Sequence, residues 1–75
     1  MRLWVQKDGK DVPVEMVEGT PVVYRYTKIE RYGYFVRVEG NMMYARTPAG
    51  EEFHGFMLWF NPIVTEEDMR ALKNQ

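Results

Sequence analysis

VVYRYTKIERYGYFVRV, the stretch from Val22 to Val38, decides the fold, because β-branched and aromatic residues fill most of it and favour strands. Arg31-Tyr32-Gly33 divides the stretch and predicts a three-residue hairpin loop, with Gly33 in the left-handed conformation. A second, two-residue turn is expected at Gly40-Asn41. Together the two turns predict a three-stranded antiparallel meander over residues 22–30, 34–39 and 42–47.

Turn signals on both sides of this meander continue the pattern. Asp8-Gly9 is a strong hairpin signal and joins an expected strand over residues 2–7 to one over 11–17. Residues 53–60 predict a nearly all-apolar last strand, and Thr65 followed by three acids predicts the start of a C-terminal helix. This order of elements is similar to that of SH3-like barrels. We therefore expect a mainly β fold: a small antiparallel barrel or bent sheet of five or six strands with one C-terminal α-helix, in a single domain over residues 1–75.

Size and composition set further limits. The chain has 75 residues and no Cys, so no disulfide supports its core. Two Trp, five Tyr, four Phe and six Met supply the apolar side chains that such a small core needs. The longest apolar run, Phe56–Phe60, is far shorter than the roughly 20 residues of a membrane span, and no signal peptide is recognisable. We expect a cytoplasmic protein without membrane contact.

The predicted register brings basic and aromatic side chains together. The turn at Gly40-Asn41 pairs position 37 with 44, 38 with 43, 36 with 45 and 35 with 46, and the loop at 31–33 pairs position 25 with 39. One face of the meander, which includes Tyr26, is expected to form the core. The other face carries a predicted partner-binding cluster: Arg25, Phe35, Arg37, Tyr44 and Arg46.

Three interpretations of this cluster remain open at the level of sequence. It is a solvated sheet face, a protein-binding face rich in the residue types of interface cores, or a platform that stacks single-stranded nucleic acid on its aromatic rings. Charge disfavours the third interpretation. Residues 20–47 hold five basic and two acidic side chains, a net charge of +3, but residues 48–75 hold two basic and five acidic ones, a net charge of −3. A nucleic-acid module is usually basic as a whole.

Catalysis finds little support in the residue types. The chain has neither Ser nor Cys, so two common nucleophiles are absent. His54 is the single His, and no spacing of metal ligands surrounds it. Glu51 and Glu52 would point to opposite sides of a strand, and the isolated glycines form no phosphate-binding loop. We therefore expect no enzyme, no metal and no cofactor.

The last predicted strand suggests a second kind of contact. Both of its side-chain parities are apolar, so one of them, made of Phe56, Leu58 and Phe60, is a candidate interface of a homodimer. For the chain as a whole we expect a non-catalytic protein-binding module or inhibitor that occupies the surface of a partner protein. Such chains resemble the accessory proteins with which phages and mobile elements block host machinery, and the host cytoplasm would then be the site of action. The alternatives are a single-stranded nucleic-acid-binding protein and a structural subunit of an assembly.

Overall fold

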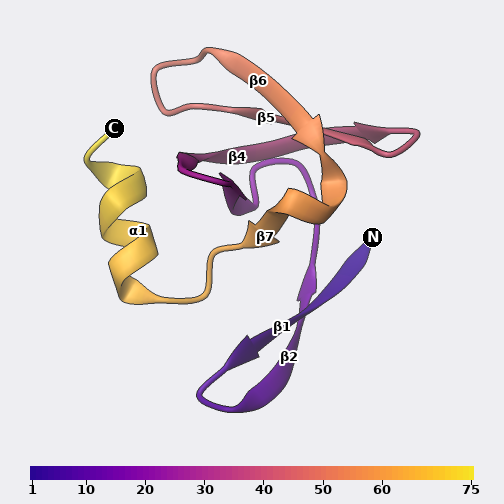
Figure 1. Ribbon diagram of the computed structural model, residues 1–75, viewed down its shortest axis with the longest axis vertical. Coiled ribbons are helices and arrows are strands. Elements are labelled where there is room, and N and C mark those ends of the chain that lie inside the picture. Colours follow the sequence, from indigo (N-terminus) through magenta and orange to yellow (C-terminus); the bar gives the residue numbers. More distant parts are fainter.

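A computed structural model describes all 75 residues and shows a mainly β chain that ends in a helix (Figure 1). The strands form two antiparallel sheets, a two-stranded one in the order β1-β2 and a five-stranded one in the order β6-β5-β4-β3-β7. The elements, in chain order, are β1 (Arg2–Lys7), β2 (Lys10–Glu15), β3 (Pro21–Tyr26), β4 (Ile29–Glu39), β5 (Met42–Arg46), β6 (Glu52–Phe56), the 3₁₀ helix η1 (Met57–Trp59), β7 (Phe60–Pro62) and α1 (Glu66–Lys73). The predicted fold class is confirmed.

Two of the predicted turns form where the sequence places them. Asp8 and Gly9 both take positive φ values, of 53° and 78°, and close the β1–β2 hairpin as a two-residue turn whose twist suits antiparallel strands. Gly40, with a φ of 61°, begins the turn between β4 and β5. This turn confirms two predicted pairs, position 37 with 44 and position 38 with 43.

The predicted loop at residues 31–33 is wrong. The chain turns earlier, at Thr27-Lys28, so that position 26 pairs with 29 and position 25 with 30 instead of 39. Gly33 lies inside β4, opposite Val22. A Cβ atom on Gly33 would lie 2.6 Å from the carbonyl oxygen of Arg46 and 2.9 Å from a ring carbon of Phe53. This glycine therefore permits a close approach of two strands and does not form a turn.

A second correction concerns the register between β4 and β5. The pairing shifts between Phe35 and Arg37, which leaves one extra residue, Val36, in β4. Phe35 therefore pairs with Ala45, where the sequence predicted Arg46. Because side chains alternate across a sheet, this one-residue bulge moves Phe35 from the exposed face to the interior, where its exposed fraction is 8%.

The segment predicted as one strand over residues 53–60 is broken in the structure. It consists of β6, η1 and the start of β7, and it carries the chain from one edge of the five-stranded sheet to the other. The interruption by η1 ends the strand alternation on which the predicted dimer interface depended. Phe60 is buried in the core, Phe56 is half-buried, and Leu58 is exposed. The predicted set of Phe56, Leu58 and Phe60 therefore does not form one face.

The core consists of two clusters on opposite faces of the bent five-stranded sheet. The first lies inside the bend, on the side of the sheet that faces the β1–β2 hairpin, which Figure 1 shows below the sheet. Its buried members are Met16, Val22, Phe35, Met43, Ala45 and Phe60. The second consists of Val23, Tyr32 and Leu72 and lies beneath α1. The adjacent residues Val22 and Val23 of β3 belong to different clusters, so this strand is buried on both faces. Burial on both faces explains its run of consecutive apolar residues.

Helix α1 begins as the sequence predicts. The hydroxyl oxygen of Thr65 accepts a hydrogen bond of 3.2 Å from the backbone N–H of Asp68, which satisfies one of the free amides of the first turn. Leu72 is fully buried against the sheet. At eight residues, α1 is too short to cross a bilayer, and the chain has no other α-helix.

Candidate functional site

Three of the five predicted partner-binding residues lie together on the outer face of the sheet. Arg37 of β4 stacks on Tyr44 of β5, with its guanidinium carbon 4.1 Å from the ring centroid. The ring of Tyr44 stacks in turn on His54 of β6, at 5.1 Å between centroids. Arg46 follows on the same face of β5, near Glu52. We call Arg37, Tyr44, Arg46, Glu52 and His54 the outer cluster.

The positive charges of the outer cluster are already paired. Arg37 donates hydrogen bonds to Glu39 and, at 3.4 Å, to Glu52. Arg46 lies 4.0 Å from the same carboxylate of Glu52. The hydrogen bond to Glu39 is the main reason that the pKa of Arg37 is raised above its ordinary value. A phosphate or a carboxylate of a ligand would have to compete with these internal partners.

Arg25, the fourth predicted residue, lies in a different place. It donates hydrogen bonds of 2.7 Å to Glu30 and 2.8 Å to Asp68, and thereby joins β3 and β4 to the first turn of α1. Tyr32 donates a hydrogen bond of 2.7 Å to Glu30. The bond to Glu30 is the largest cause of a raised pKa for Arg25, and the same bond lowers the pKa of Glu30. This arrangement attaches the helix to the sheet. Phe35, the fifth predicted residue, lies in the core.

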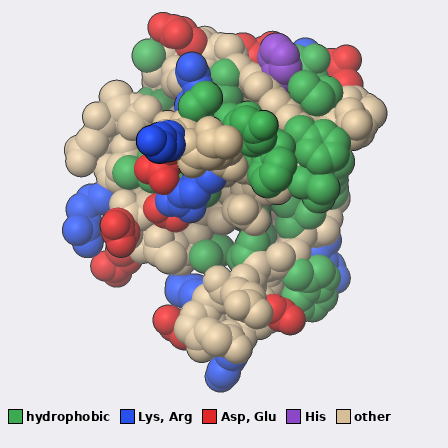
Figure 2. Space-filling model, viewed as in Figure 1, with side chains coloured by type: hydrophobic (Ala, Val, Ile, Leu, Met, Phe, Trp, Pro, Cys, Tyr) green, Lys and Arg blue, Asp and Glu red, His purple; other side chains and the backbone are tan.

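A patch of large apolar side chains is exposed where the β3–β4 turn meets η1. We call Tyr26, Ile29, Leu58 and Trp59 the aromatic patch. Their exposed fractions lie between 42% and 72%. Tyr26 and Ile29 face each other across the turn, and the ring of Trp59 contacts that of Tyr26 edge-on at 5.2 Å between centroids. Figure 2 shows hydrophobic side chains gathered on the right of the molecule, over the region where β6 leads into η1.

The aromatic patch is not predictable from the strand pattern, for two identifiable reasons. The wrong loop at residues 31–33 placed Tyr26 in the core, and the unbroken last strand hid the 3₁₀ turn that exposes Leu58 and Trp59. The sequence gives little indication of the turn at Thr27-Lys28, because a β-branched residue at a φ of 53° is an outlier and Thr is therefore a poor turn residue there.

A groove of about 340 Å³ extends from the aromatic patch toward β6. Its lining comes from three strands and consists of Tyr24, Ile29, Arg31, Glu52, Phe53 and His54. Ile29 belongs both to this groove and to the aromatic patch, so the two surfaces are continuous. The guanidinium of Arg31 lies 6.0 Å from the ring centroid of Phe53. We call this depression the edge groove.

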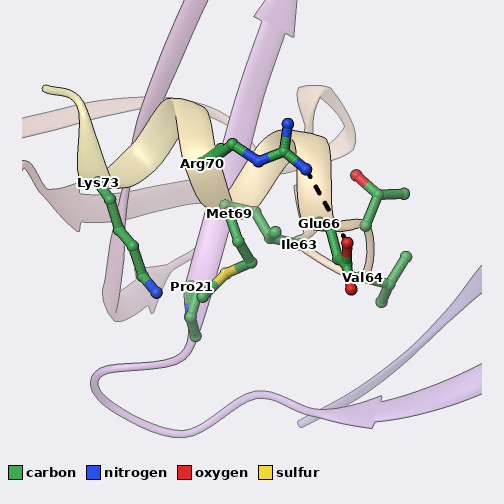
Figure 3. Close-up of a pocket in the computed structure, with 8 residues that line it drawn as sticks. Pro21, Ile63, Val64, Glu66, Met69, Arg70 and Lys73 are labelled. Carbon is green, nitrogen blue, oxygen red and sulfur yellow. Dashed lines mark ion pairs between the residues drawn. The ribbon is translucent and has the colours of Figure 1, made fainter.

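A larger depression, of about 550 Å³, lies beside α1 (Figure 3). Figure 3 shows the side chains of Met69 and Lys73 directed from the helix toward Pro21, with Glu66 and Val64 at the other end of the depression. Its one internal ion pair, between Arg70 and Glu66 at 3.9 Å, joins two highly exposed side chains. No buried polar side chain points into it, so it has the character of an imperfect fit between the helix and the sheet.

Metal binding and similarity to known proteins add no further site. No group of three or more His, Asp or Glu side chains lies close enough together to hold a metal ion. Comparison with models of protein families, with curated proteins and with solved structures finds no match. The function must therefore be inferred from the surfaces of this chain.

Proposed function

We propose that this chain is a non-catalytic protein-binding module that acts by occupying a partner's surface, and that the aromatic patch is its contact surface. The observation that carries the proposal is the clustering of four large exposed apolar side chains around the contact between Tyr26 and Trp59. Tyr and Trp are the residues most enriched at the energetic centres of protein interfaces. Exposed apolar side chains scattered singly are ordinary, whereas a contiguous group marks an interaction surface.

Backbone strain in the same place supports the proposal. Thr27 takes a φ of 53° in the turn that sets Tyr26 and Ile29 side by side. A left-handed conformation costs a non-glycine residue about 1–2 kcal/mol. Such strain is concentrated at functional sites, where the geometry that it produces is needed.

The charge arrangement favours a protein partner over single-stranded nucleic acid. A nucleic-acid platform needs a basic groove along which the phosphate backbone runs. The arginines of the outer cluster and Arg25 are all paired with carboxylates of the chain. Near the aromatic patch, only Lys28 and Arg31 lack such a partner, and two cations supply little of the affinity that phosphate contacts require.

Capture from a nuclease-treated lysate of the source organism tests the proposal. Trp59→Ser should abolish capture, because truncating a central interface residue costs about 2 kcal/mol or more, roughly a thirtyfold loss of affinity. Trp4→Ser is the matched control, since Trp4 is 63% exposed on β1, away from the patch. Both variants should unfold within a few degrees of the original chain. Capture that survives Trp59→Ser, or that disappears on nuclease treatment, would contradict the proposal.

A further inference from the structure

The strand β6 has a free edge. It is the first strand of the order β6-β5-β4-β3-β7 and bonds to β5 alone. The backbone N–H of Met57 donates a hydrogen bond of 2.9 Å to the carbonyl of Asn41. In an antiparallel pair, residues bond to the neighbouring strand and point away from it alternately, so the N–H and C=O of His54 point away from β5. A row of unpaired backbone groups of this kind is a template for another strand.

Two other edge strands, β7 and β2, carry features that discourage pairing. β7, at the far edge of the same sheet, is three residues long and ends in Pro62. β2 has Pro13 at its centre. Short edges and edge prolines are the usual protection against added strands. β6 has five residues and no Pro, so within the five-stranded sheet it is the edge better able to accept a strand. β1 has six residues and no Pro as well, but of these two edges only that of β6 borders the edge groove.

The edge groove lies where the side chains of an added strand would go. It runs between β6 and the β3–β4 hairpin, with the rings of Tyr24 and Phe53 and the side chain of Ile29 as its apolar lining. An extended segment along β6 would direct every second side chain toward this lining. Its end would meet the aromatic patch, because Ile29 belongs to both surfaces.

Charge indicates the chemistry of that segment. Arg31 lines the groove and Lys28 lies in the adjoining turn, and neither forms an ion pair within the chain. The nearby carboxylates are engaged elsewhere: Glu30 binds Arg25, and Glu52 binds the arginines of the outer cluster. The surface therefore offers two cations without an ion-pair partner beside a groove in which three of the six lining residues are apolar, and this combination is complementary to an acidic and apolar segment.

We propose that β6 binds an extended segment of the partner protein as an added strand, with apolar side chains in the edge groove and an acidic side chain beside Arg31 and Lys28. This mode of recognition combines main-chain hydrogen bonds with pockets for alternate side chains. The inference rests on the proposed function, because it specifies how the partner meets the same surface.

A peptide-display selection on the full chain provides the probe. A library of random linear peptides should yield ligands in which apolar residues alternate with Asp or Glu. A synthetic copy of the strongest ligand should lose at least tenfold in affinity when its backbone is N-methylated at every second residue, and little when the intervening residues are methylated. Binding should also slow hydrogen exchange at the backbone amide of His54.

Charge reversal gives the matched comparison. Arg31→Glu should weaken binding of the selected peptide at least tenfold. Lys7→Glu makes the same change of charge on the β1–β2 hairpin, where it faces Lys10 and creates a favourable cross-strand pair, and it should leave binding unchanged. Equal loss in both variants would overturn the proposal.

Other results separate this inference from the proposed function. Selected peptides without alternation, or N-methylation without effect, would overturn strand addition even where capture remains sensitive to Trp59→Ser. A concentration-dependent dimer in which the His54 amide is protected would replace the partner segment with a second copy of the chain. Failure of Trp59→Ser to reduce lysate capture would instead remove the proposed function itself.

Discussion

Substitution of Gly33 tests the register on which the exposed surfaces depend. The structure places this residue in the middle of β4, where an added Cβ would lie 2.6 Å from the carbonyl oxygen of Arg46 and 2.9 Å from the ring of Phe53. Real Cβ atoms essentially never approach so closely. Since the nearer obstacle is backbone, it cannot rotate away, and β4 and β5 would have to separate.

The expected cost follows from these contacts. Overpacking a well-filled site costs about 1–3 kcal/mol and occasionally more. Replacement of a strand glycine recovers about 0.5–1 kcal/mol of backbone entropy. Because the clash involves backbone, the overpacking cost of Gly33→Ala should lie near the upper end of this range of about 1–3 kcal/mol. After the entropy gain is subtracted, we expect the free energy of unfolding to fall by about 2 kcal/mol. For a chain of this size the total stability is about 4–11 kcal/mol, and the melting temperature should fall by roughly 8–16 °C.

Thermal and urea denaturation, monitored by circular dichroism, measure this loss of stability. Asn variants then show whether the loss comes from a clash with the neighbouring strand or from a left-handed backbone conformation. Asn tolerates the left-handed conformation of a loop better than other non-glycine residues do. Gly33→Asn should nevertheless be at least as damaging as Gly33→Ala, because the larger side chain meets the same strand. Gly50, with a φ of 94° and no atom near its missing Cβ, is the control. Gly50→Asn should cost about 1 kcal/mol, the low end of the cost of a left-handed non-glycine residue, and less than Gly33→Asn. If Gly33→Asn proved milder than Gly33→Ala, Gly33 would be a loop residue and the register would be refuted.

Two further predictions concern pH and backbone strain. The hydrogen bond from Arg25, followed by that from Tyr32, lowers the pKa of Glu30 below its ordinary value of 4.5. This pairing therefore stabilises the fold above pH 4.5, and its contribution is lost as the pH falls through the lowered pKa. Urea denaturation from neutral pH to about pH 3 should therefore show a smaller loss of stability on acidification for Arg25→Gln than for the original chain; equal losses would contradict the assignment. Thr27→Gly should stabilise the chain by about 1 kcal/mol by relieving the left-handed strain, whereas Thr47→Gly, at a residue without positive φ, should destabilise it in the same melting experiment.

The candidate surfaces were predictable only in part. The pairing of Arg37 with Tyr44 follows from a turn that lies within three residues of both, and it appears in the structure as expected. Arg25 shares the outer face of the sheet with these residues by strand alternation, but it does not lie beside them: it pairs with Glu30 and not with position 39, because the predicted loop does not form. The sequence also could not show that both arginines of the outer cluster share a carboxylate, since that acceptor, Glu52, comes from a strand that is neither β4 nor β5. The aromatic patch combines residues from two distant segments and has no local signature.

Local signals in the sequence determined the mainly β class, the hairpin turns at Asp8-Gly9 and Gly40-Asn41, and the helix start at Thr65, because backbone preference and capping act within a few residues. Only the tertiary structure decided the turn at Thr27, the extra residue in β4 and the break after β6. Strand side chains alternate with a period of two, so a shift of one residue exchanges the buried and the exposed faces. Burial of Phe35 and the close contact at Gly33 outweigh local turn preference, and they thereby select which aromatic rings face the solvent.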